Sequence, residues 1–221
     1  MMERVTEPEL MDEDEQAKAY AEADFEEAHS RFIALFQEHF PDVTDGTVLD
    51  LGCGPGDITF RFARAHPRAS VHGVDGSDAM LHYGRVALAQ NPQLARRVQL
   101  ITGFLPGAAL PQSSYDAVIS NSLLHHLHDP SVMWDSVRKF AAKGSPVYVM
   151  DLMRPESDSE VDRLVETYAG SEPEVLRRDF QASLKAAFTL SEVKDQLRNA
   201  GLGHLNVKPV SDRHLLVTGR A

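Results

Sequence analysis

Three glycines, Gly52, Gly54 and Gly56, lie within five residues of one another and are flanked by Asp50 and Asp57. Glycine inside a regular element costs about 0.5–1 kcal/mol relative to alanine, so this cluster indicates a sharp turn or a backbone that a ligand approaches closely. The apolar run before it predicts a strand, and the residues after it predict a helix whose first N–H groups lack partners. Glycine turns in this position are where α/β sheets bind nucleotides.

The charge around this turn limits which nucleotide could bind. The glycines have the spacing G-x-G-x-G rather than the G-x-G-x-x-G of dinucleotide sites. A carboxylate at the turn would repel a pyrophosphate but suits a ligand that carries a cationic amine. Asp75 ends the next predicted strand, where a carboxylate can accept hydrogen bonds from both ribose hydroxyls and rejects a 2′-phosphate. The expected ligand is a nucleoside with free hydroxyls, no phosphate and a positive charge, which describes S-adenosylmethionine.

Short β-rich runs alternate with helical runs over the middle of the chain. This alternation predicts a parallel sheet with helices on both faces. The last two strands are joined only by residues 211–213, so they must be antiparallel, because a parallel crossover needs a dozen or more residues. The predicted strands are Val48–Leu51, Val71–Val74, Val98–Thr102, Ala117–Ser120, Pro146–Asp151, Leu205–Val210 and His214–Thr218.

Helical periodicity dominates the remaining segments. The first ten residues are expected to be a loose charged arm, followed by one helix over residues 12–40, where apolar residues recur at spacings of three and four. Residues 152–188 predict two helices, and Thr189 with Glu192 has capping-box spacing at the start of another. Further helices are expected over 58–65 and 77–91 and after the Asp129-Pro130 pair.

Three segments resemble the successive motifs of the class I S-adenosylmethionine-dependent methyltransferases, and most closely those of the small-molecule and quinone-type group. They are "VLDLGCGPGDITFRFA", "VHGVDGSDAML" and "YDAVISNSLLHHLHDP". One glycine motif alone would be weak, but three in order on matching elements are specific. The resemblance implies an α/β, Rossmann-like seven-stranded sheet, mostly parallel with an antiparallel last strand. Helices would cover both faces, and extra helices would cover the carboxyl edge.

The same resemblance divides the chain into a methyltransferase domain over residues 46–221, with a helical insertion over 152–188, and an acidic arm and helix over 1–45. Two readings of the N-terminal part stay open: it packs on the flank of the sheet, or it folds over the site as a lid. The insertion raises the same choice, because it follows the fifth strand at the carboxyl edge. In the lid reading, Tyr20 would contact the substrate, and Arg154 could pair with an anionic acceptor.

The resemblance also assigns cofactor contacts. Asp75 would bind the ribose hydroxyls, and the backbone carbonyl of Asn121 would accept from the methionyl amine. The family usually has an acid after the third strand that binds the adenine amine, whereas this chain has Phe104 there. Either stacking and backbone groups hold the adenine, or the register of this segment differs. The expected cofactor-binding residues are Asp50, Gly52, Cys53, Gly54, Gly56, Asp75, Gly76, Ser77, Met80, Gly103, Phe104 and Asn121.

Methyl transfer from a sulfonium is an in-line displacement that depends mainly on approach and alignment. A general base adds roughly 10²–10⁴-fold when the acceptor is a hydroxyl or thiol. His125 and His126 follow the fourth strand at the carboxyl edge, and are the candidate catalytic residues. In the alternative, they form a helical turn with one ring packed and the other solvated. No metal site is expected, since adjacent histidines cannot easily face one ion.

Composition narrows the function further. The net charge is −11, but residues 1–30 contribute −9 of it, and the body has no lysine- or arginine-rich stripe. No nucleic-acid partner is therefore expected. The resemblance implies a small-molecule substrate, and the chain is expected to have no membrane partner and to be a monomer or a homodimer. The single cysteine, Cys53, and the absence of an apolar leader or span suggest the cytoplasm.

Other functions remain open on the sequence. They are an RNA or protein methyltransferase and a catalytically silent S-adenosylmethionine-binding protein. The spacing of the glycines and the acid at Asp50 disfavour a nicotinamide-dependent oxidoreductase.

Overall fold

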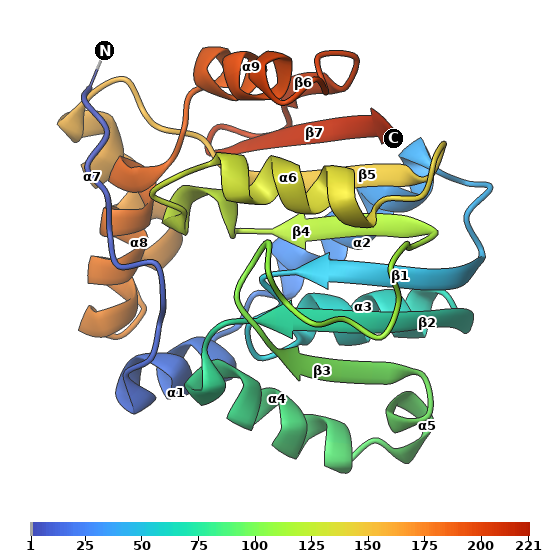
Figure 1. Cartoon of the computed structure of the whole chain (residues 1–221). Helices are drawn as coiled ribbons and strands as arrows, with labels where there is room; N and C mark the ends of the chain where they lie inside the picture. Colours follow the sequence, from blue (N-terminus) through green and yellow to red (C-terminus); the bar gives the residue numbers. More distant parts are fainter. Residues whose placement is uncertain (1) are drawn as a thin grey trace.

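A computed structural model of the chain describes residues 2–221 and contains one seven-stranded sheet with the order β3-β2-β1-β4-β5-β7-β6 (Figure 1). Neighbours from β3 to β5 pair in parallel, whereas β7 is antiparallel to both β5 and β6. The predicted fold class is thereby confirmed. The strands are β1 Asp45–Leu51, β2 Arg68–Asp75, β3 Val98–Thr102, β4 Ala117–Asn121, β5 Pro146–Leu152, β6 Asn206–Pro209 and β7 His214–Arg220.

The central strands are apolar because helices cover both of their faces. Every residue of β5 is buried, and alternate side chains enter different cores. Val147 and Val149 face a core that includes Trp134, whereas Tyr148 and Met150 face one built around aromatic rings. The helices are α1 Asp14–Glu22, α2 Glu26–His39, α3 Asp57–Ala65, α4 Asp78–Ala89, α5 Pro92–Ala95, α6 Ser131–Phe140, α7 Asp158–Ala169, α8 Glu174–Ala186 and α9 Leu190–Asn199, with a 3₁₀ turn, η1, at Leu124–His126.

The predicted single helix over residues 12–40 is wrong, because the chain breaks it between α1 and α2. Ala23 is extended, with ψ of 147°, and the side chain of Asp24 accepts a hydrogen bond from the N–H of Glu26, 2.9 Å away. Such a local side-chain contact satisfies a backbone donor at the start of the second helix. The break lets α1 leave the line of α2 and lie near α4 and α8.

Residues 2–11 do not form a loose arm, contrary to the prediction. They form an extended segment, here termed the N-terminal strap, beside α7 and α8 (Figure 1). The Arg4 guanidinium anchors it by donating to the carbonyl oxygens of Ala186, His125 and Leu127 at 2.6–3.0 Å, and it lies 3.9 Å from the ring centre of Phe188. Backbone acceptors do not show in a charge pattern, so sequence analysis missed this anchor.

The other predicted helices are present in the structure, at the places in the chain where they were expected. Thr189 and Glu192 form the expected capping box at the start of α9. The segment over 152–188 forms α7 and α8. Over residues 2–221, the structure has no helix that is both long enough and apolar enough to cross a bilayer.

Phe36 joins α2 to the sheet, so its truncation should destabilise the protein. Its ring lies 4.8 Å from that of Phe62 and 5.4 Å from that of Tyr148, and it is fully buried. We expect Phe36→Ala to lower the free energy of unfolding by about 3–5 kcal/mol, measured by urea denaturation. Its exposed neighbour provides the control, and Gln37→Ala should change this free energy by less than about 0.5 kcal/mol. Equal effects of the two variants would contradict the packing described.

Candidate functional site

A cavity of about 600 Å³ lies at the carboxyl ends of β1, β2 and β4. This is the edge where α/β sheets bind ligands. The turn after β1 forms its floor, and its other walls come from the strap, η1, α1, α2, α7 and α8. Segments from both ends of the chain therefore meet at one opening. Most of the residues predicted to bind the cofactor line it: Asp50, Gly52, Cys53, Gly54, Asp75, Gly76, Ser77, Met80, Gly103, Phe104 and Asn121.

The three glycines of the turn have left-handed backbone angles but different roles. Gly52 (φ +68°) has no room for a side chain, since a Cβ there would come within 2.7 Å of Leu123. Gly54 (φ +51°) has nothing within 4 Å of the position of a Cβ, so its bare backbone faces open space. Gly56 (φ +87°) precedes α3 and does not line the cavity. The turn thus offers the backbone at Gly52 and Gly54 to a ligand, and Gly56 serves the turn itself.

Asp75 ties the second strand to the glycine turn. Its Oδ2 accepts the N–H of Gly54 at 2.8 Å, and its Oδ1 accepts the N–H of Ser77 at 2.8 Å. Each carboxylate oxygen can accept a second hydrogen bond, so the group can still bind two hydroxyls. Burial raises the pKa of Asp75 above its usual value, although these backbone donors oppose the effect. The hydroxyl of Ser77 donates to the carbonyl of Met11 at 2.9 Å, which holds the strap over this corner.

Asp50 lies at the bottom of the cavity and is almost fully buried. Its one hydrogen-bonding side chain is that of Thr59, whose hydroxyl donates to Oδ2 at 2.5 Å. Burial raises the pKa of Asp50 to about 7, against the opposing effect of this hydrogen bond. A cationic ligand group would therefore stabilise the ionised form. Burial also raises the pKa of the Cys53 thiol, as expected for a packed residue rather than a nucleophile.

A strained residue at the end of β4 was not found from the sequence. Ser122, directly after Asn121, has φ of +57°, and both residues line the cavity. A non-glycine residue in this region costs of the order of 1–3 kcal/mol, and such strain concentrates at functional sites. The N–H of Ser122 donates to the carbonyl of Met150 at 3.0 Å, which holds the kink in place. Serine gives no signal for this conformation, which a glycine or an asparagine would have indicated.

Apolar side chains form a slot beside Asp75. Phe104 is 64% exposed and stands at the cavity. A Cβ on Gly76 would lie 3.1 Å from the Phe104 ring and 2.9 Å from Leu10 of the strap, so these three residues are close together. The strap thus supplies a contact that sequence analysis did not assign to the site.

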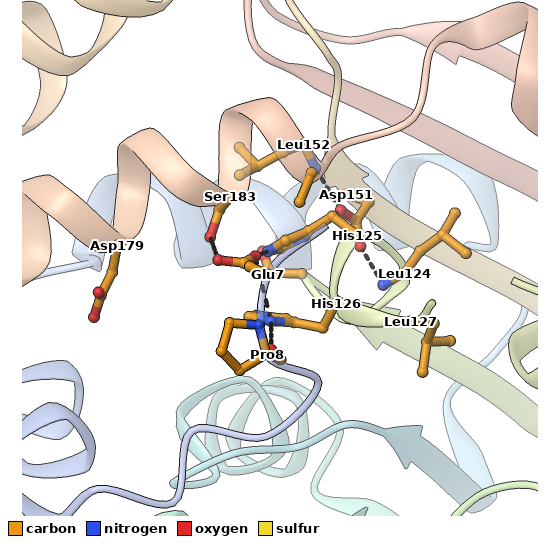
Figure 2. Close-up of polar contacts among 12 residues, drawn as sticks. Glu7, Pro8, Leu124, His125, His126, Leu127, Asp151, Leu152, Asp179 and Ser183 are labelled. Atoms are coloured by element: carbon orange, nitrogen blue, oxygen red, sulfur yellow. Dashed lines mark hydrogen bonds and ion pairs between the residues drawn. The ribbon is translucent and has the colours of Figure 1, made fainter. Parts of the chain in front are cut away.

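The two candidate catalytic histidines lie in a buried polar cluster, shown in Figure 2. Asp151, at the end of β5, accepts from His125 Nδ1 at 2.6 Å and from the N–H groups of Leu124 and Leu152 at 2.7 and 2.8 Å. Glu7 Oε1 of the strap lies 3.5 Å from His125 Nε2 and 3.4 Å from His126 Nδ1. His125 and His126 also line the cavity, so the cluster borders the open space.

The two rings of this cluster differ in their affinity for protons. Burial by itself would lower the pKa of His125, but the adjacent carboxylates of Asp151 and Glu7 outweigh it, and the pKa lies above the usual value. Burial and the neighbouring His125 lower the pKa of His126 to about 3. At neutral pH, His126 is therefore uncharged.

Asp151 and Glu7 were both missed from the sequence. Asp151 is the single charged residue in the apolar run of β5, and a lone acid in a buried strand is a usable signal. Glu7 gives no such signal, because it belongs to an acidic N-terminal stretch in which most other acids are exposed.

Of the two predicted substrate contacts, only Tyr20 lines the cavity. Its ring lies 4.8 Å from that of Phe25 at the break between α1 and α2. Arg154 lies elsewhere: it is 7% exposed and donates to the carbonyl of Ala187 at 2.9 Å and to Glu192 Oε1 at 2.6 Å. A guanidinium held in this way braces the start of α9 and does not face the cavity.

The fixed charges around the outer part of the cavity are mostly acidic. Its two guanidinium groups are already paired: Arg61 with Asp57 at 2.7 Å and also with Glu26, and Arg213 with Asp212 while it stacks 3.3 Å from the Tyr168 ring. Other acids line this outer part and form no ion pair among residues 2–221: Glu9, Asp24, Glu27 and Glu172.

Comparison with known proteins identifies the domain to which this site belongs. Residues 49–147, from β1 to β5, match a family model described as "Methyltransferase domain". This chain carries a methyltransferase domain. A solved structure of a putative S-adenosyl-L-methionine-dependent methyltransferase from Methanococcus maripaludis has the same fold, with a TM-score of 0.72 at 16% identity over 97% of this chain and 95% of the other.

Curated relatives match the methyltransferase domain over part of their length. An uncharacterized methyltransferase of Mycobacterium tuberculosis is 29% identical over 128 residues, which is 58% of this chain and 61% of the relative. A trans-aconitate 2-methyltransferase of Methylobacterium radiotolerans is 31% identical over 152 residues, 67% of this chain and 54% of the relative. The matched region thus spans less than two thirds of either relative.

Ionisation of Asp50 should make the ligand-free methyltransferase domain less stable as the pH rises. The folded pKa lies above the unfolded value, so between about pH 4 and 7 the folded state holds the proton that the unfolded state has lost. The contribution of this group to stability therefore falls with rising pH and levels off above pH 7. We expect Asp50→Asn, which cannot ionise, to gain stability over the wild type across this range, measured by urea denaturation at pH 5, 6, 7 and 8. A stability difference that does not change with pH would contradict the assignment.

Proposed function

We propose that this protein transfers the methyl group of S-adenosylmethionine to a small-molecule acceptor and releases S-adenosylhomocysteine. The observation that carries the proposal is the corner formed by Gly54 and Asp75. There, a glycine backbone faces open space, and a half-buried carboxylate is fixed against it by a 2.8 Å hydrogen bond. That arrangement suits a ribose that lies against the turn.

The remaining polar groups of the cavity suit the other parts of this cofactor. Asp50 and the end of β4 at Asn121 would hold the methionyl end, where an amine would keep the buried carboxylate ionised. Phe104, Gly76 and Leu10 would enclose the adenine by apolar contact, in place of the missing acid. The bound cofactor would supply an activated methyl group, and the chain would supply alignment and exclusion of water. Gly103, Ser77 and Met80 line the same wall.

The acceptor would enter from the side where α1, α8 and the strap form the wall. The guanidinium groups of the cavity lining are paired with acids, whereas several acids of the lining have no cationic partner among residues 2–221. This balance favours a neutral or cationic small molecule over a polyanion, since a carboxylate acceptor would find no unpaired arginine or lysine in the lining. We assign the strap, α1 and α8 the role of a lid, because Met11 and Leu10 touch the cofactor corner, and Tyr20 lines the acceptor side.

Two other functions can be tested against this one. A silent binding protein would bind the cofactor and turn over no acceptor, and a nucleic-acid methyltransferase would need cationic groups to neutralise phosphates. The paired guanidinium groups of the lining favour a small molecule over an RNA.

Cofactor binding should depend on Asp75. We expect calorimetric titration with S-adenosylhomocysteine to show one site, and Asp75→Ala to weaken it roughly 10- to 100-fold, since one or two hydrogen bonds to a charged acceptor are lost. Asp78→Ala removes the same charge three residues away, from an exposed side chain, and should leave the affinity unchanged. Binding of NAD, or equal effects of the two variants, would count against the proposal. Radioactive methyl transfer to a panel of small amines and hydroxyl compounds would then separate the enzyme from a silent binder.

The open space at Gly54 provides a second test. Gly54 and Gly144 both have positive φ (+51° and +79°) and free space around the position of a Cβ. Alanine at either position should lower the free energy of unfolding by about 1–2 kcal/mol, because both adopt left-handed angles. Only Gly54→Ala should also weaken S-adenosylhomocysteine binding, because its methyl group would occupy the space that the ligand needs. Equal affinities for the two variants, measured by calorimetry, would show that the ligand does not approach this turn.

A further inference from the structure

Three ligand-type atoms converge beside the cavity: Glu7 Oε1, His125 Nε2 and His126 Nδ1 (Figure 2). All three lie within 4.8 Å of one another. They come from two segments that are more than a hundred residues apart, the strap and η1. We propose that these residues bind a divalent transition cation of the zinc class. Imidazole and carboxylate ligands of this kind suit zinc and its neighbours rather than magnesium or calcium.

Two of the three separations between these atoms fit such an ion. A tetrahedral zinc ion with bonds of about 2.0–2.1 Å holds its ligand atoms roughly 3.3–3.4 Å apart. Glu7 Oε1 lies 3.5 Å from one nitrogen and 3.4 Å from the other. The adjacent histidines can approach one point, because the two rings present different nitrogens to the same oxygen. Their centres are 4.2 Å apart, and their planes are tilted by 35°.

The hydrogen bonds around the three atoms leave Glu7 Oε1 and His125 Nε2 without another partner, and His126 Nδ1 is available to an ion in the tautomer that carries its proton on Nε2. His125 donates its Nδ1 proton to Asp151 at 2.6 Å, so the Nε2 lone pair can face Glu7. Glu7 Oε1 is buried and accepts no hydrogen bond, while its Oε2 is 3.3 Å from the Ser183 hydroxyl. His126 Nδ1 has one other neighbour, the Pro8 carbonyl, at 3.4 Å.

A proton on His125 Nε2 is the alternative to a metal ion. A hydrogen bond between an imidazolium and a carboxylate would draw the two atoms to about 2.7–2.9 Å, whereas they lie 3.5 Å apart. By contrast, the bond from Nδ1 of the same ring to Asp151 has a length of 2.6 Å. The separations around Glu7 Oε1 are thus longer than that of an ionic hydrogen bond and close to the spacing of ligand atoms around a tetrahedral ion.

Asp151 acts as the outer partner that a metal-bound histidine usually has. It orients the His125 ring through Nδ1, and the N–H groups of Leu124 and Leu152 hold it in place. With Glu7, it provides two negative charges, which balance a divalent ion. Three protein ligands leave a fourth position open, and both histidines line the cavity. An open position facing the cavity is typical of a site that binds water or substrate rather than of a purely structural one.

The test is metal binding by the full chain without an affinity tag. After dialysis against a chelator, titration with Zn²⁺ should show one site per chain, and Co²⁺ should give the visible absorption of a four-coordinate ion. Glu7→Gln and His126→Ala should each weaken Zn²⁺ binding at least about 10-fold. His82→Ala removes an exposed imidazole on α4, outside the cluster, and should have no effect.

Two results would overturn the proposal: no stoichiometric Zn²⁺ binding by the wild type, or unchanged binding in both ligand variants. Circular dichroism of the chelator-treated variants establishes that they are folded, and His126→Ala serves as the second ligand variant if Glu7→Gln does not fold. Titration of the same samples with S-adenosylhomocysteine separates this proposal from the proposed function. Wild-type protein that binds S-adenosylhomocysteine but no stoichiometric Zn²⁺ would reject the metal site alone.

Discussion

The arrangement at the carboxyl edge depends on a buried carboxylate, that of Asp151. It is 1% exposed, and β5 has no other charged residue. A carboxylate in such a place must be fully hydrogen-bonded, and it receives the N–H groups of Leu124 and Leu152 together with His125 Nδ1. These bonds fix η1 against β5. The backbone carbonyl groups of η1 and the following residue then accept from Arg4, so the same carboxylate indirectly positions the strap.

The fold could be predicted from the sequence because the apolar runs and the helical segments alternate in the order that a parallel sheet with covering helices requires. The run Val98–Thr102 matches β3 at both ends, and the strands of the covered sheet are short apolar runs between helical segments. The glycine turn could also be predicted, because positive φ angles favour glycine. Asp75 could be predicted because it is an acid at the end of a strand beside that turn. These features depend on neighbours in the chain.

The features that could not be predicted depend on contacts between distant segments. The strap reaches η1 through Arg4 and Glu7, across more than a hundred residues, and backbone carbonyls carry no sequence signal. The kink at Ser122 is held by the partner strand rather than by its own residue type. Arg154 was misassigned because a cation after a strand can equally face a cavity or a neighbouring acid, and only packing places it against Glu192.

The burial of the single thiol makes the protein a convenient object for labelling. Cys53 lies within the glycine turn and is 7% exposed, and this burial raises the pKa of its thiol. It should therefore react slowly with alkylating reagents in the folded protein. A cysteine introduced at an exposed position of the strap would carry a fluorophore or spin label selectively. The rate at which Cys53 is alkylated would then report how often the glycine turn opens. One chain would thus carry separate reporters for movement of the strap and of the glycine turn.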